Sequence, residues 1–191
     1  MAHNIDIAKS ALIERASLES NDLVIEADAK VTDVTIKVRK IHIKSDAILT
    51  RSKIFSDGEV VVGNRSEIKS DVVINAFRNV IIGDRTIIDR DVTVGGTQSE
   101  KSEFIVGDDS AILYRAYLNT TRKISVGDNS GIGGYANIIT HSSWHNALRG
   151  GSYKFCTVQS WGHFTKPMSV TTTISCFLPK NLEESPTESV Q

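Results

Sequence analysis

Two histidines lie close together in this sequence, and an imidazole is the side chain best suited to moving a proton at neutral pH. Its ordinary pKa of about 6.5 lets it accept a proton from a hydroxyl group and release it again. His141 follows the run Ile138–Thr140, and His145 comes shortly after it. We expect His141 to act as general base toward a hydroxyl, with His145 orienting the acceptor or sharing its proton. The alternative is a surface loop whose histidines have no role.

The residues around these histidines could hold a ligand. Trp144 offers a flat ring on which a sugar could stack, or which could pack against a neighbouring subunit. Arg149 could pair with a carboxylate or phosphate, or simply lie on the surface. Backbone N–H groups at Gly133–Gly134 and Gly150–Gly151 could stabilise negative charge on an oxygen, because glycine lets the backbone approach closely. The first pair is better explained as a tight corner, whereas the second would let the loop after Arg149 turn back.

An aliphatic residue returns every six positions through the middle of the chain. Four triplets share this spacing: Val62, Ile68 and Ile74; Ile82, Ile88 and Val94; Val106, Ile112 and Leu118; Val126, Ile132 and Ile138. The residue four places after the first two members of each triplet is small or β-branched: Ser66, Val72, Thr86, Val92, Ser110, Ala116, Ser130 and Ala136. The third members differ, because Arg78 and Arg122 follow them and extra residues enter there. One corner of each repeat therefore tolerates bulk and insertion.

A period of six fits neither an amphipathic helix nor a single strand, which repeat every 3.6 and 2 residues. It is typical of a parallel β-helix, in which each coil of three short strands stacks on the last and aliphatic side chains fill the interior. The pattern predicts two earlier coils, the second of them weak: Ile43, Leu49 and Phe55, then Ile25 and Val31, with Lys37 at the third position.

The remaining segments divide the chain into regions. Residues 1–24 contain Leu12, Ile13, Ala16 and Leu18 and are expected to form a short helix or an irregular cap, because an open end exposes unpaired backbone groups. Residues 25–155 form the repeat domain, with a candidate active-site loop at 141–155. The stretch 95–105 reads as a surface insertion or a flap over a neighbouring site. Residues 156–191 are expected to be irregular, and their polar end mobile.

The line VGDNSGIGGYANIITHSSWHNALRGGSYKF, from Val126 to Phe155, resembles the hexapeptide-repeat acyltransferases. That family includes galactoside, maltose and serine acetyltransferases and many polysaccharide O-acetyltransferases. The resemblance implies an all-β, left-handed parallel β-helix and a homotrimer with active sites between the columns. The repeat match covers residues 25–140, and the active-site match covers Val126 to Phe155.

The resemblance also implies a reaction, the transfer of an acetyl group from acetyl-CoA to a sugar hydroxyl. His141 would take the proton of the acceptor and return it to the departing thiolate, with no covalent enzyme intermediate. Asn119 and Tyr114, one coil earlier, would face the same region and are candidates for contact with a sugar or glycan acceptor.

Two alternatives to an enzyme of this class remain open. After Phe155 the VxIGxxxWIG coils usual in the family are missing, so the donor groove could be incomplete and the chain a non-catalytic assembly module. Carbonic anhydrases built on the same β-helix fold bind zinc through histidines of adjacent subunits. Beyond His141 and His145, only His163 could join such a site, so we expect no bound metal.

Bulk composition narrows the function classes further. The chain has 191 residues, enough for one domain, a formal net charge of -1 and a pI near 6.5, so nothing favours a nucleic-acid or anionic-membrane partner. It contains no apolar stretch of the roughly 20 residues that span a bilayer and no secretory core at its start, which favours the cytoplasm. Cys156 and Cys176 lack metal-type spacing and are expected to be free thiols.

Overall fold

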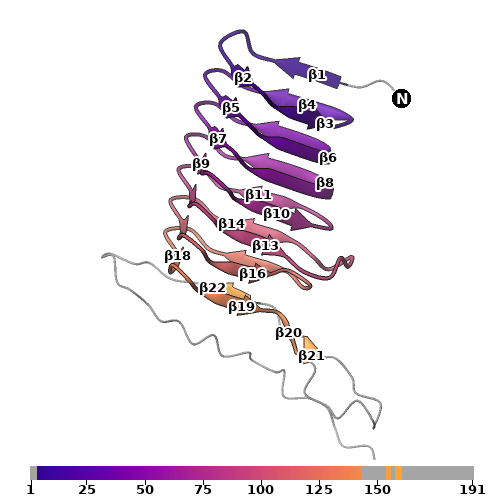
Figure 1. The fold of residues 1–191 in the computed structure, drawn as a ribbon, viewed down its shortest axis with the longest axis vertical. Helices are drawn as coiled ribbons and strands as arrows, with labels where there is room; N and C mark the ends of the chain where they lie inside the picture. The colour runs from indigo at the N-terminus through magenta and orange to yellow at the C-terminus, as the bar shows by residue number, and fades with distance from the viewer. Residues whose placement is uncertain (1–3, 143–153, 156–157, 161–191) are drawn as a thin grey trace, which may run out of the picture.

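The computed structural model describes residues 4–142, 154–155 and 158–160, which form a tall column of stacked strands (Figure 1). The column is a parallel β-helix of about 7 turns, with three short strands to a turn and no helix among the described residues. The predicted fold class is therefore confirmed. We name its three sides A, B and C in the order in which each coil visits them.

Strands of one side stack in parallel register. Side A contains β1 (Asn4–Ile7), β4 (Asp22–Ile25), β11 (Val80–Ile82), β14 (Phe104–Val106), β17 (Ile124–Val126) and β22 (Val158–Ser160). Side B contains β2 (Leu12–Glu14), β5 (Lys30–Thr32), β7 (Ile48–Thr50), β9 (Glu67–Ile68), β12 (Ile87–Ile88), β15 (Ala111–Ile112) and β18 (Gly131–Ile132). Side C contains β3 (Ser17–Glu19), β10 (Val73–Ala76), β13 (Thr93–Gly95), β16 (Tyr117–Asn119) and β19 (Asn137–Ile139).

Two longer strands and one hairpin complete the described elements. The longer strands run from side C into side A without a break: β6 (Thr35–Ile43) and β8 (Lys53–Val62). The hairpin pairs β20 (His141–Ser142) with β21 (Lys154–Phe155) in antiparallel fashion. No helix of the described residues is long and apolar enough to cross a membrane.

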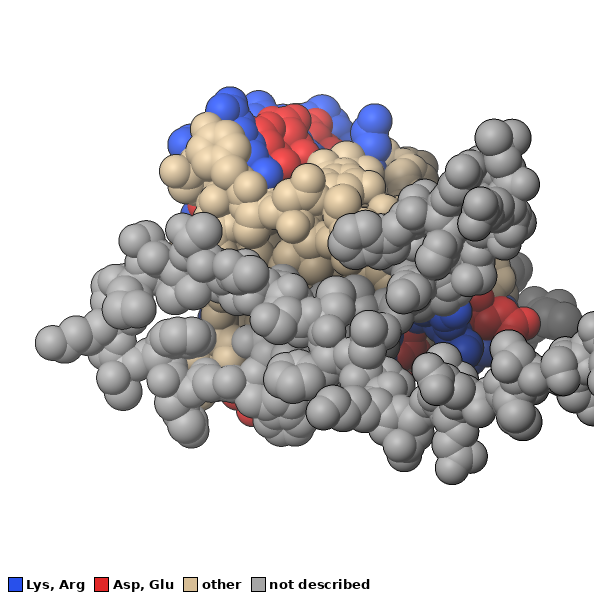
Figure 2. All heavy atoms as spheres, turned by 90° about the horizontal axis from the view of Figure 1, so that it is seen from below, with Lys and Arg blue, Asp and Glu red and all other residues tan. Residues whose placement is uncertain are grey.

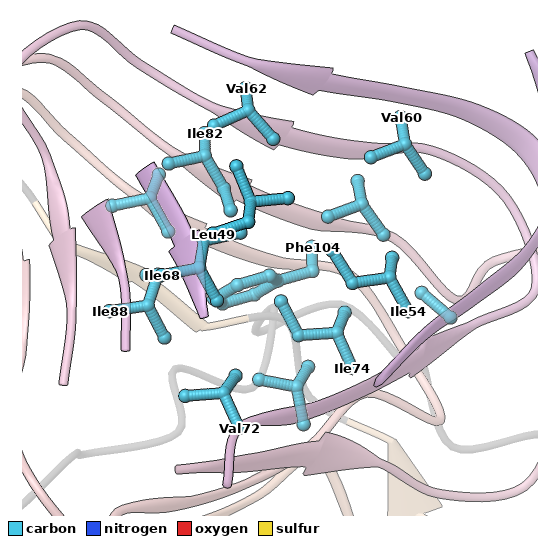
Figure 3. Packing of buried hydrophobic residues seen from close by; sticks show 14 of the residues in the cluster. Leu49, Ile54, Val60, Val62, Ile68, Val72, Ile74, Ile82, Ile88 and Phe104 are labelled. Atoms are coloured by element: carbon cyan, nitrogen blue, oxygen red, sulfur yellow. The ribbon is translucent and has the colours of Figure 1, made fainter. Parts of the chain in front are cut away.

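The aliphatic repeat fills the inside of the column, as the sequence predicts. Every member of the four triplets is at most 9% exposed, and corresponding members stack on one another, as Val62, Ile82 and Val106 do on side A. Figure 3 shows side chains from all three sides pointing into this common interior. Because each coil leaves its upper and lower surfaces apolar, the core is continuous only when coils stack.

The small residues of the repeat differ between two corners for a physical reason. At the A–B corner they carry hydroxyls that bridge consecutive coils. Thr86 Oγ1 donates to the Gly107 carbonyl at 2.6 Å and accepts from the Ser110 N–H at 3.2 Å, and Ser66 bonds to the next coil in the same way. At the B–C corner the corresponding position of these coils holds an apolar residue, such as the buried Val92. Hydroxyls therefore satisfy backbone groups that the A–B turn leaves without ladder partners.

A second ladder at the A–B corner explains its repeated glycines. The Asp84 N–H donates to Asp108 Oδ1 at 2.8 Å, and the Asp108 N–H donates to Asp128 Oδ1 at 2.8 Å. A Cβ on Gly83 would lie 2.5 Å from both Asp108 Oδ1 and the carbonyl carbon of Gly107. The coils approach so closely here that only glycine fits.

Turns at two corners use the left-handed backbone region. The residue before each small position has a positive φ, and charged residues dominate this position at the B–C corner: Arg15, Asp33, Arg51, Asp71, Asp91, Arg115 and Tyr135. Arg15 pairs with Asp33, Arg51 with Asp71, and Arg115 with Asp91, so three ion pairs join consecutive coils at the B–C corner. The C–A corner has only Gly96 at positive φ among the described residues. It lacks the tight turn, which is why insertions enter there.

The predicted register is wrong by one residue in two early coils. Ile54 is fully buried in place of Phe55, and Ile36 is buried in place of Lys37, which is exposed. The B–C turn is one residue shorter in these coils, because the left-handed residue Arg51 comes two places after Leu49 rather than three. The aliphatic spacing is five there.

The first described coil consists of strands rather than a helix. β1, β2 and β3 pair with β4, β5 and β6, so the segment expected to form a cap adds one more coil to the column. Ile5 and Ile7 stack on Leu23 and Ile25 and remain 63% and 41% exposed, because no described coil lies above them.

Candidate functional site

His141 stands where the chain leaves the column. Strand β19 ends side C of the seventh coil at Ile139, Thr140 is fully buried, and His141 opens β20. His141 is the backbone partner of Phe155 in the β20–β21 hairpin. The backbone of Phe155 therefore lies beside His141.

The column continues after this hairpin. Val158–Ser160 forms β22 and pairs in parallel register with Ile124–Val126 of side A. One strand of the segment 156–191 thus begins an eighth coil next to the seventh, at the C-terminal end of the column. The rest of that segment lies outside the described residues, as do Cys156, His163 and Cys176.

The backbone in front of His141 is fixed by hydrogen bonds to the coil above. Thr140 Oγ1 donates to the Asn119 carbonyl at 2.7 Å and accepts from the Arg122 N–H at 3.0 Å. Because Thr140 is fully buried, replacing this hydroxyl would leave two backbone groups without partners. The direction in which the chain leaves the corner at His141 is therefore well determined.

Asn119 is the centre of this buried polar network. Its Oδ1 accepts from the Thr121 N–H at 3.1 Å and from Thr121 Oγ1 at 2.7 Å, and its Nδ2 donates to the Tyr117 hydroxyl at 3.3 Å. Asn119 is only 8% exposed. Its amide is therefore committed to shaping the corner, and one edge of it reaches the exposed ring of Tyr117.

The insertion 96–103 packs onto the same corner, one coil above Asn119. The Thr97 N–H donates to Thr121 Oγ1 at 3.1 Å, and Ser99 Oγ donates to the Thr121 carbonyl at 2.7 Å. Gly96 has a φ of 153°, and a Cβ there would lie 2.6 Å from Asn119 Oδ1. The insertion is thus anchored by specific contacts, and three consecutive coils contribute polar groups to the C–A corner.

The other predicted residues of the described chain lie at a different corner. Tyr114 and Gly133–Gly134 are at the B–C corner, at the opposite end of side C from Asn119 and His141. The Ala136 N–H donates to the Gly133 carbonyl at 3.3 Å, so this pair forms a tight turn between strands. The structure brings Asn119 and His141 to one corner and separates Tyr114 from them.

Sequence reasoning missed the neighbours of Tyr114. Its ring meets that of Tyr135 edge to face, with centroids 5.2 Å apart and planes at 77°. The Arg90 guanidinium lies 5.9 Å from the Tyr114 ring centroid, and Arg115 lies 5.7 Å from that of Tyr135. The repeat itself contains the signal, because Tyr135 occupies the corner position that holds Asp, Asn or Arg in the other described coils.

Resolved pKa shifts fall on the two charged corners. The Asn64 amide lowers the pKa of the Asp84 carboxyl, and hydrogen bonds from Arg85 and Arg15 lower the pKa of Asp109 and of Asp33. Each of these carboxylates accepts a hydrogen bond from a residue of the neighbouring coil. The lowered pKa values are therefore a consequence of coil stacking. No group of three or more His, Cys, Asp or Glu side chains in the described residues is arranged to hold a metal ion.

Trp144, His145, Arg149 and Gly150–Gly151 lie outside the described residues. Comparison with protein-family models, curated proteins and solved structures gives no significant match to this chain. The fold and the geometry of the C–A corner are therefore the basis for any functional conclusion.

Proposed function

We propose that this chain is an acyl-CoA-dependent O-acyltransferase that transfers an acetyl group to a sugar hydroxyl, with His141 as general base. The observation that carries the proposal is the position of His141, directly after side C of the seventh coil and paired with Phe155, with β22 adding a further strand to side A. The hexapeptide-repeat acyltransferases, which the sequence from Val126 to Phe155 resembles, have their catalytic histidine directly after an aliphatic strand.

The proposed reaction requires one proton transfer by the chain in each direction. A hydroxyl is a poor nucleophile at neutral pH, so His141 accepts its proton as the oxygen attacks the thioester carbonyl carbon. When the carbon–sulfur bond breaks, the same proton passes from the imidazolium to the departing thiolate. The hydrogen bond between Thr140 and Asn119 fixes the backbone just before His141. Of the two glycine pairs, Gly150–Gly151 is the better candidate for stabilising the oxyanion, because Gly133–Gly134 lies at the other end of side C.

The donor groove is the second requirement. β22 stacks on β17 and so extends side A beyond His141, which supports a surface on both sides of the histidine along which acetyl-CoA could lie. By the resemblance, the active form is a homotrimer in the cytoplasm, with acceptor and donor meeting between two columns.

Thiol release from acetyl-CoA in the presence of a panel of sugars tests the proposal. We expect sugar-dependent release in the wild type and a loss of about 10²–10⁴-fold in kcat for His141→Ala. His42→Gln is the matched control, because His42 pairs with Glu26 at 2.5 Å on side A, far from the C–A corner. Release that no sugar stimulates, or that survives His141→Ala, would refute the proposal. In that case a stable oligomer that binds no acetyl-CoA would favour an assembly module.

A further inference from the structure

The Tyr114–Tyr135 pair is an exposed aromatic surface held in one arrangement. Tyr135 is 62% exposed and Tyr114 is 38% exposed. Arg115 Nη1 donates to the Tyr135 hydroxyl at 2.9 Å, and its Nε lies 3.5 Å from Asp91 Oδ2. The Tyr135 ring is therefore fixed from its outer edge while most of the residue faces solvent.

The backbone is adapted to present these rings. A Cβ on Gly134 would lie 3.0 Å from Tyr114 Cε1 and 3.1 Å from its Cζ, so the absence of a side chain lets the Tyr114 ring lie against the turn. Tyr135 has a φ of 58°, a conformation unfavourable for a bulky residue. At the equivalent turn of the A–B corner, Asn129 adopts a φ of 49° with a residue suited to it. The positive φ is common to this turn in the other coils, so what distinguishes Tyr135 is a large aromatic side chain at a position that holds Arg or Asp at the B–C corner of the other described coils.

The cluster also contains a cation that is not committed elsewhere. Within the described part of the chain, the Arg90 side chain forms no salt bridge, and its guanidinium packs over the Tyr114 ring. Charged side chains at this end of the column gather in separate groups with uncharged surface between them (Figure 2). A planar donor beside exposed rings can bond to hydroxyl or carboxylate oxygens of a ligand that stacks on those rings.

This combination selects one class of ligand. A sugar ring has an apolar face that packs on an aromatic ring and a rim of hydroxyls that needs donors and acceptors. A rigid tyrosine loses little conformational entropy on binding, which suits a weak, repeated contact. We propose that Tyr114, Tyr135 and Arg90 bind one sugar unit of a glycan chain, at a subsite separate from the C–A corner.

Tyr135 lies on the same coil as His141, at the other end of side C. It precedes His141 by six positions, which corresponds to at most roughly 20 Å at about 3.3 Å per residue. A monosaccharide cannot reach both ends, whereas a chain of several sugar units can. If the proposed function holds, on which this part of the inference rests, the acceptor is therefore a polymer or oligomer that lies along side C, past Tyr117.

A glycan array carrying neutral, N-acetylated and uronic-acid oligosaccharides tests the subsite directly. We expect the wild type to bind a subset of these chains and Tyr135→Asn to bind the same chains about tenfold more weakly. Asparagine suits the positive φ, so this variant keeps the turn while removing the ring. Tyr135→Phe keeps the ring and should bind within about twofold of the wild type. Ile81→Ala, which removes most of an exposed apolar side chain on side A, is the control.

These experiments distinguish failure of the glycan-binding subsite from failure of the proposed acetyltransferase activity. An array with no bound oligosaccharide, or one on which Tyr135→Asn binds as well as the wild type, overturns the subsite. Equal weakening by Tyr135→Phe and Tyr135→Asn also overturns it, because stacking would not be the cause. Glycan binding that needs the Tyr135 ring, in a protein without acetyl transfer, refutes the proposed function and leaves the subsite in place. His141→Ala should abolish transfer, while glycan binding by that variant should still depend on the Tyr135 ring.

Discussion

The glycine ladder of the A–B corner makes a sharp prediction for Gly83→Ala. The new Cβ would lie 2.5 Å from Asp108 Oδ1, 2.5 Å from the Gly107 carbonyl carbon and 2.6 Å from the Asp108 nitrogen. Two of these atoms are backbone, so rotation of a side chain cannot relieve the clash. The stacked coils must move apart by roughly 1 Å to reach ordinary van der Waals contact.

The expected cost follows from what that movement breaks. Overpacking of a rigid site costs about 1–3 kcal/mol. The bond from the Asp84 N–H to the Asp108 carboxylate, 2.8 Å long, must lengthen, and a hydrogen bond to a charged group contributes about 1.5–3 kcal/mol. Alanine restricts the unfolded chain and returns about 0.4–1 kcal/mol. We expect the free energy of unfolding to fall by roughly 2–4 kcal/mol.

Urea titration followed by circular dichroism measures this difference. Gly95→Ala is the matched control, because a Cβ there has its nearest neighbour, the Asn75 carbonyl oxygen, at 3.8 Å. We expect its stability to stay within about 0.5 kcal/mol of the wild type. Equal stability of Gly83→Ala and Gly95→Ala would refute the claim that coil contact selects glycine at this corner.

Two further predictions concern the same corner. Thr86→Val removes a hydroxyl that donates to the Gly107 carbonyl and accepts from the Ser110 N–H, so it should lower the free energy of unfolding by about 1–3 kcal/mol. Thr86→Ser keeps the hydroxyl and should retain most of the wild-type stability. Equal urea midpoints for the two variants would contradict this prediction. The Asn64 amide lowers the pKa of Asp84 below its unfolded value, so this stabilisation is present at neutral pH and is lost as the pH falls below about 4. The Tm gap between wild type and Asp84→Asn should therefore close toward pH 3, and a gap constant with pH would show that the carboxylate charge is not involved.

The fold could be predicted because its signal is local and repeated. Each coil places the same aliphatic positions inside the column. Val62, Ile82 and Val106 therefore indicate the same inward-facing position in three consecutive coils. The register of Ile54 and Ile36 could not be predicted from the six-residue rule. A turn that is one residue shorter changes which side chain faces inward, and only the left-handed backbone of Arg51, two places after Leu49, reveals it.

The small residues at the A–B and B–C corners also show what the sequence reveals and what only the structure explains. The sequence displays alternation of hydroxyl and apolar residues, as in Thr86 and Val92, without a reason for it. The reason for the hydroxyls lies in the tertiary structure, where Thr86 bonds to the Gly107 carbonyl and the Ser110 N–H of the next coil.

The sequence by itself determined the repeat, the continuous apolar interior and the place of His141 at the end of an aliphatic strand. These depend on residue type and spacing along one strand, which a six-residue pattern specifies. Tertiary stacking alone decided that Asn119 shares a corner with His141, while Tyr114 lies beside Tyr135, Arg90 and Arg115 at another. Residues that are far apart in the chain become neighbours only through the rise and rotation of successive coils, and the lengths of the turns between strands set that rotation.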